Sequence, residues 1–171
     1  MITILTGPVR TGKTTTLRHV CTARAHAEPM AGVLQPVIDG RRHLVDLATS
    51  AQRVLEAPPD APEAAVVRVG RFAFSAEAFA WARERLRAAA PAPAGWVIVD
   101  EVGPLELRGM GLAPALDAVL ECGRTAGGPH VLLVIRAPLL VEARAVLGLA
   151  EAPVVRLGDT LPGGVRLVAE R

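Results

Sequence analysis

The sequence predicts an open α/β sheet, because apolar runs of strand length alternate with segments of helical periodicity along the chain. The run WVIVD at residues 96–100 is apolar up to its last residue, which is typical of a central parallel strand. The run ITILT, residues 2–6, leads directly into a glycine-containing loop and then a helix. A chain of 171 residues can bury a core of its own, and we expect residues 1–171 to form a single domain.

The first part of the chain is predicted to contain a strand, a helix and a hairpin. Residues 1–7 form a short buried strand that ends in glycine, and a helix follows over residues 14–27. Residues 31–49 contain two extended runs around Asp39-Gly40, a dipeptide that strongly favours a hairpin turn. Pro36 favours an edge position for the first of these runs. We therefore expect a β-hairpin insertion after the first helix.

The rest of the chain continues the alternation of strands and helices. Strands are predicted at 52–57, 65–74, 96–100, 130–136 and 153–157, and loops at 57–64 and 90–95. Helices are predicted from Ser75 to about Ala89, from Leu112 to Cys122 with Gly123 as the C-cap, and from Pro138 to Gly148. The tail from Gly158 carries no clear pattern.

The composition excludes several classes of function. Apolar residues make up 51% and charged residues 21%, which is typical of a folded globular chain. The net charge is only +2 and aromatic residues amount to 3%, so we expect no nucleic-acid partner. No apolar run approaches the roughly 20 residues that span a bilayer, and the N-terminal run is too short for a signal peptide. We expect a cytoplasmic protein without a membrane partner.

The loop GPVRTGKTTT, residues 7–16, is the first candidate site, because it matches the phosphate-binding pattern G-x-x-x-x-G-K-[ST]. Glycines permit the loop to curl around a phosphate chain, and the N-terminus of the following helix attracts the anion. The lysine would reach the β and γ phosphates, and the hydroxyl of Thr14 would bind Mg²⁺. The expected nucleotide-binding residues are Gly7, Pro8, Val9, Arg10, Thr11, Gly12, Lys13, Thr14 and Thr15.

The lysine itself supports this interpretation. Of 19 basic residues in the chain, 18 are arginine and one is Lys13. A composition so rich in alanine, arginine, glycine and proline replaces lysine by arginine wherever either residue serves. Lys13 therefore marks a position where a compact ammonium is needed and the broad guanidinium fork fits poorly.

The acidic pair Asp100-Glu101 is the second candidate site. It ends an apolar strand, which places both carboxylates at the edge where open α/β sheets bind ligands. Asp100 would hold Mg²⁺ through water. Glu101 suits a general base that positions an attacking water, a role in which it would act together with Lys13. The pair fits ATPases that activate water with a glutamate, so the two sites predict an enzyme that hydrolyses nucleoside triphosphates.

Four charged residues are weaker candidates. Glu106 lies just past the acidic pair, where it could orient the site or bind a substrate. Arg136 ends a strand near the same edge, where it could sense charge or contact a base, or be an ordinary surface arginine. Arg41 and Arg42 follow the hairpin turn and are expected on a solvated face.

Four segments of the chain resemble a known family, the small P-loop nucleoside-triphosphatases first described from thermophiles, which has a vertebrate cancer-related member. The segments are ITILTGPVRTGKTTTL, GVLQPVIDGRRHLVDLAT, VGRFAFSAEAF and VIVDEVGPLEL. The last is the most specific, because generic P-loop proteins do not carry Gly103 and Glu106 after the acidic pair. The chain departs from the family in the loop middle PVRT and in the tail from Gly158, which does not match the family's closing helix.

The resemblance covers roughly residues 2–157 and implies a RecA-like, mostly parallel sheet with helices on both faces. It also implies slow, Mg²⁺-dependent hydrolysis of ATP, GTP and other nucleoside triphosphates, with loose base selectivity. Carried over by position, it assigns Gly7–Thr15 to the phosphates, Asp100 to the metal and Glu101 to the water.

Two other functions stay open. A small-molecule or nucleotide kinase would use Glu101 to deprotonate an acceptor hydroxyl, with Glu106 and the hairpin near that acceptor. Such kinases usually close an arginine-rich lid, whereas the loop at 57–64 is rich in proline and acid. A nucleotide-dependent regulatory module would instead use hydrolysis to time its contact with a partner protein or a second copy.

Overall fold

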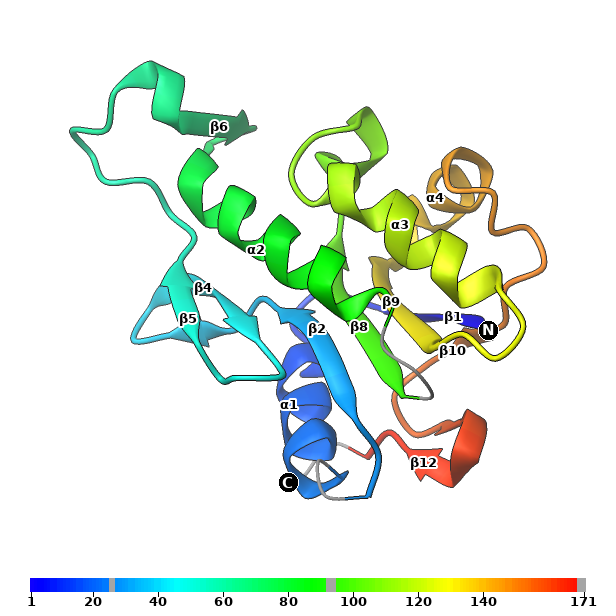
Figure 1. Cartoon of the computed structure of the whole chain (residues 1–171). Coiled ribbons are helices and arrows are strands. Elements are labelled where there is room, and N and C mark those ends of the chain that lie inside the picture. Colours follow the sequence, from blue (N-terminus) through cyan, green and yellow to red (C-terminus); the bar gives the residue numbers. More distant parts are fainter. Residues whose placement is uncertain (25–26, 92–94, 169–171) are drawn as a thin grey trace.

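A mostly parallel sheet forms the centre of the protein (Figure 1). The structure is a computed structural model, which describes residues 1–24, 27–91 and 95–168. Within these ranges the strand order is β10-β1-β9-β8-β2-β4-β3, with β5 paired to β4. The bounds are β1 Ile2–Gly7, β2 Met30–Leu34, β3 Val37–Ile38, β4 Arg41–Asp46, β5 Gln52–Val54, β8 Trp96–Val102, β9 His130–Arg136 and β10 Val154–Val155.

The five strands from β10 to β2 run parallel, so their carboxyl ends meet at one edge of the sheet. Strand β9 lies between β1, which leads into the glycine loop, and β8, which carries the acidic pair. Gly7 at the end of β1 is opposite Arg136 at the end of β9. This order confirms the RecA-like sheet, and it places the two predicted motifs on either side of one intervening strand.

Helices cover both faces of the sheet, as expected. The helices α2 (Ala76–Ala89), α3 (Ala113–Arg124) and α4 (Leu140–Val146) lie on one face, and α1 (Lys13–Arg24) lies on the other (Figure 1). Side chains of the central strands alternate between the two cores. In β9, for example, Leu133 faces the α2–α3 core and Leu132 faces the α1 core.

The predicted hairpin insertion is present, with one change. Its turn is at Asp39-Gly40, between β3 and β4, where both residues have positive φ. The extended run before the turn divides at Gln35-Pro36 into two strands. β2 is an interior strand paired with β8, whereas β3 ends the strand order at the edge that Pro36 favours.

Two element predictions need correction. The single strand expected at 65–74 is a hairpin of β6 (Val66–Val69) and β7 (Phe72–Ser75), because Gly70, with φ +55°, turns the chain. Gly123 is not a C-cap, since α3 continues through it to Arg124. A side chain at Gly123 would press on Val131, so the glycine permits close packing of helix on strand. Residues 25–26 of the first predicted helix lie outside the described residues.

The tail forms a small antiparallel hairpin of β11 (Thr160–Leu161) and β12 (Val165–Arg166). Its apolar side chains Leu161, Val165 and Leu167 are buried in the core beneath α1. The tail therefore covers sheet surface where the family resemblance implied a closing helix. No helix in the described ranges has the length and apolar character needed to cross a bilayer.

Candidate functional site

The glycine loop joins β1 to α1 and curls around the lysine side chain. Gly12 has φ +86°, and Arg10 takes up a left-handed conformation with φ +61°. The Lys13 side chain is buried, and its ammonium donates to the carbonyl oxygens of Pro8 at 2.6 Å and Gly7 at 3.3 Å. The first amides of α1 have no acceptor within the helix, so they are available to an anion in front of the loop.

A groove of about 410 Å³ lies in front of this loop. All of the predicted loop residues from Val9 to Thr15 line it. The rest of the lining consists of Arg18, Gln35, Pro36, Val37, Arg42, Glu101 and Arg136. Arginine and lysine side chains outnumber the single carboxylate, Glu101, in the whole lining, so the groove suits a polyanion.

Asp100 is fully buried in the last part of β8, directly behind Thr14, which lines the groove. Its Oδ2 accepts hydrogen bonds from the Thr14 hydroxyl at 2.7 Å and from the Gln35 amide at 3.0 Å. Its Oδ1 is buried, and no group in the described part of the chain forms a hydrogen bond with it. Burial raises the pKa of the Asp100 carboxyl to about 6, against the hydrogen bonds from Thr14 and Gln35, which lower it.

The side chains of Thr14 and Asp100 fit Mg²⁺, the cofactor expected from the sequence. Mg²⁺ takes one or two protein oxygens and completes its shell with water and phosphate oxygens. The unpartnered Oδ1 of Asp100 and the adjacent Thr14 hydroxyl match that need. The described residues contain no group of three His, Cys, Asp or Glu side chains that would form a protein-only metal cage.

Asp100→Asn is expected to remove a pH dependence of stability. The folded pKa of about 6 exceeds the ordinary 3.8, so the stability that Asp100 contributes is complete below pH 3.8 and is lost as pH rises through 6. The unfolding free energy of Asp100→Asn minus that of wild type should therefore rise by about 3 kcal/mol between pH 3.5 and pH 8. Urea unfolding without metal or nucleotide measures this difference. A difference that does not change with pH would contradict the raised pKa of the buried Asp100 carboxyl.

Glu101 follows Asp100 in a bulge of β8, with a left-handed backbone at φ +59°. Its Oε2 accepts two hydrogen bonds from Arg136, from Nε at 2.9 Å and from Nη2 at 2.7 Å. The bulge turns the carboxylate out of the sheet and into the groove beside the glycine loop. The structure thus brings Arg136 to Glu101, which the sequence alone left undecided.

Glu106 does not lie in the phosphate groove. Its carboxylate is buried and accepts backbone hydrogen bonds from Gly103 at 3.0 Å and Leu112 at 2.9 Å. Burial raises the pKa of the Glu106 carboxyl above its ordinary value. Gly111 packs directly on the carboxylate, since a Cβ there would clash with Oε1. Glu106 therefore holds the loop between β8 and α3 in place, which explains its proximity to the acidic pair.

Glu106→Gln is expected to lower the unfolding free energy by about 1–3 kcal/mol, because the amide nitrogen cannot accept the hydrogen bond of one of the two backbone groups. Glu84→Gln on the exposed side of α2 is the matched control and should change it by less than about 0.5 kcal/mol. Thermal unfolding of the two variants measures both values. Equal stability of the two variants would show that Glu106 has no structural role.

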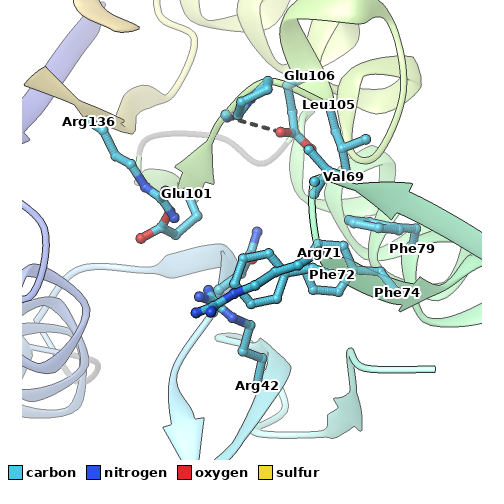
Figure 2. Close-up of a pocket in the computed structure, with 14 residues that line it drawn as sticks. Arg42, Val69, Arg71, Phe72, Phe74, Phe79, Glu101, Leu105, Glu106 and Arg136 are labelled. Atoms are coloured by element: carbon cyan, nitrogen blue, oxygen red, sulfur yellow. Dashed lines mark hydrogen bonds and ion pairs between the residues drawn. The ribbon is translucent and has the colours of Figure 1, made fainter. Parts of the chain in front are cut away.

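A second cavity, of about 220 Å³, opens on the other side of Glu101 (Figure 2). Its walls come from the β6–β7 hairpin, β8 and the loop that Glu106 holds. It shares Gln35, Arg42, Glu101 and Arg136 with the phosphate groove. The remaining lining is largely apolar and includes Val69, Phe72, Phe74, Phe79 and Leu105.

Sequence reasoning missed two residues of the site. Gln35 contacts Asp100 through its backbone amide and, at 3.2 Å, through its side-chain amide, which donates to the Asp100 carbonyl. A polar residue directly after an apolar strand was the available signal. Arg42 was expected on a solvated face with Arg41, yet it is half-buried, lines both cavities and stacks on Phe72 at 5.1 Å. Arg41 is exposed as predicted.

The sheet order and the loop define a P-loop protein of the α/β class. The chain belongs to the family described as NTPase, which it matches over residues 2–145. Membership supports nucleoside-triphosphatase activity in general terms. No curated protein sequence matches the chain.

Two solved structures have a similar fold. A human cancer-related nucleoside triphosphatase aligns with a TM-score of 0.63 and 22% identity, over 91% of this chain and 87% of that chain. THEP1 from the hyperthermophile Aquifex aeolicus aligns with a TM-score of 0.62 and 18% identity, over 92% of this chain and 90% of that chain. At these identities the likeness extends to the fold alone.

Proposed function

We propose that this protein is a Mg²⁺-dependent nucleoside-triphosphatase that hydrolyses ATP, GTP and other nucleoside triphosphates to the diphosphate and phosphate. The observation that carries the proposal is one electropositive groove lined by Lys13, Thr14 and Glu101, with Asp100 bound to the Thr14 hydroxyl behind it. Lys13 comes from the glycine loop and Asp100 and Glu101 come from β8, and each side chain has the chemistry that one part of the reaction needs.

In this proposal the loop amides and Lys13 bind the β and γ phosphates and stabilise the charge that develops when the bond between them breaks. Thr14 and Asp100 would hold Mg²⁺, which supplies charge neutralisation of the phosphate oxygens when it is bound. Glu101 accepts a hydrogen bond from the attacking water through the carboxylate oxygen that Arg136 does not engage. Gln35 keeps Asp100 in position through two hydrogen bonds.

Two features of the groove support slow turnover and loose base selectivity. The guanidinium of Arg136 donates two hydrogen bonds to Oε2 of Glu101, which leaves only the other carboxylate oxygen available to the attacking water. Within the described residues, the lining of the groove contains no aromatic side chain to stack on a base.

The test is phosphate release from ATP, GTP, CTP and UTP, with Mg²⁺ and with EDTA. We expect release from several of the four, within about tenfold of one another in kcat/KM, and none with EDTA. Release from a single nucleotide would contradict loose selectivity. Release that persists in EDTA would contradict the role of Asp100 and Thr14.

A kinase is the second candidate function, and the cavity beside Glu101 favours it. A hydrolase needs space only for water next to the γ phosphate, whereas this cavity has room for a small molecule. Glu101 lines both spaces, so it could deprotonate either a water or an acceptor hydroxyl.

A further inference from the structure

The second cavity has the size and lining of a site for one small ring. Its volume is about 220 Å³, and a cavity of about 150 Å³ in another protein binds benzene. The rings of Phe72 and Phe74 lie parallel, with centroids 5.9 Å apart, and Phe79 packs edge-on against Phe74. A flat apolar group would therefore find aromatic faces already in place.

The mouth of the cavity is positively charged. The guanidinium groups of Arg42 and Arg71 both lie over Phe72, at 5.1 Å and 5.2 Å from the ring centroid, and Figure 2 shows them converging opposite Glu101. Among the described residues no carboxylate forms a salt bridge with either guanidinium. Two arginines so close together, without acidic partners, favour an anion between them.

The two carboxylates that also line the cavity already have hydrogen-bond partners within the protein. Glu101 is paired with Arg136, and Glu106 accepts two backbone hydrogen bonds on the opposite wall. The anionic end of a ligand would thus face Arg42 and Arg71, with its ring against the phenylalanines. A hydroxyl on that ring would face Glu101, which separates this cavity from the phosphate groove.

We infer that this cavity is the acceptor site for a small aromatic acid that carries a hydroxyl group. The inference rests on nucleotide binding at the glycine loop, as proposed above. The hydroxyl oxygen would form a bond to the γ phosphorus while the bond from that phosphorus to the β–γ bridging oxygen breaks. The hydroxyl proton passes to the Glu101 carboxylate, and the nucleoside diphosphate leaves with the electron pair.

Binding is tested first, without nucleotide, by ¹⁵N-¹H NMR titration with 4-hydroxybenzoate and with phenol. We expect 4-hydroxybenzoate to shift the amides of residues 69–74 and 101–106, and phenol to bind about tenfold more weakly. Arg71→Gln should reduce the affinity for 4-hydroxybenzoate to that for phenol. Arg53→Gln is the matched control, because Arg53 stacks on Trp81 outside this cavity. Absence of shifts, or equal binding of both probes, would overturn the site.

Transfer is tested by measuring ADP and inorganic phosphate together, with ATP, Mg²⁺ and 4-hydroxybenzoate. We expect ADP to exceed phosphate, with the difference recovered as a phosphorylated product. If 4-hydroxybenzoate lowers the formation of ADP and of phosphate equally, it only excludes water from the site, and the acceptor assignment is wrong. If no ADP forms even without the probe, the hydrolase proposal fails, while the NMR titration still decides whether the cavity binds an aromatic acid.

Discussion

Glu101→Gln is expected to lower kcat for phosphate release by about 10²–10⁴-fold, the usual contribution of a general base. Glutamine keeps the size of the side chain and one carbonyl oxygen, but it cannot take a proton from water. The amide also loses the charged pairing with Arg136, which holds the carboxylate in the groove at 2.7 Å. Nucleotide affinity should change little, because the phosphates are bound by the loop on the other side of the groove.

Single-turnover phosphate release and a separate nucleotide-binding titration distinguish these effects. Glu121→Gln, on the exposed side of α3, is the matched control and should turn over at the wild-type rate. If Glu101→Gln bound nucleotide and released phosphate at the wild-type rate, water would be activated by another group, and the assignment of Glu101 would be wrong.

Lys13→Arg is expected to lower kcat/KM about as strongly as Lys13→Ala, by about 10²–10³-fold. The Lys13 ammonium lies inside the loop with acceptors between 2.6 and 3.4 Å, and the side chain is only 7% exposed. A planar guanidinium is wider than this space, so the retained positive charge cannot reach the phosphates in the same way.

The reciprocal substitution is Arg166→Lys in the tail hairpin, which is exposed and remote from the groove. It should leave kcat/KM unchanged, since either cation serves at a solvated position. Steady-state rates for the three variants measure the comparison. If Lys13→Arg kept more than about a tenth of the wild-type kcat/KM, the inference from the only lysine in the chain would be wrong.

The sequence by itself was enough to predict the parallel sheet, the glycine loop and the acidic pair. Each depends on contiguous residues: an apolar run specifies a buried strand, and glycines at fixed spacing specify a curled loop. Gly7 ends β1 and Asp100 lies two residues before the end of β8, so parallel pairing alone places them at one edge of the sheet. The family resemblance added the RecA-like order, which the structure confirms.

Only the tertiary structure decided which further side chains meet at that edge. Arg136 reaches Glu101 because β9 lies next to β8, and Arg42 enters the groove because the hairpin folds back over the end of β2. The same holds for Glu106, whose two partners are backbone amides that no sequence pattern identifies. Periodicity determines which face of an element is buried, but the strand order and the turns determine which buried faces come together.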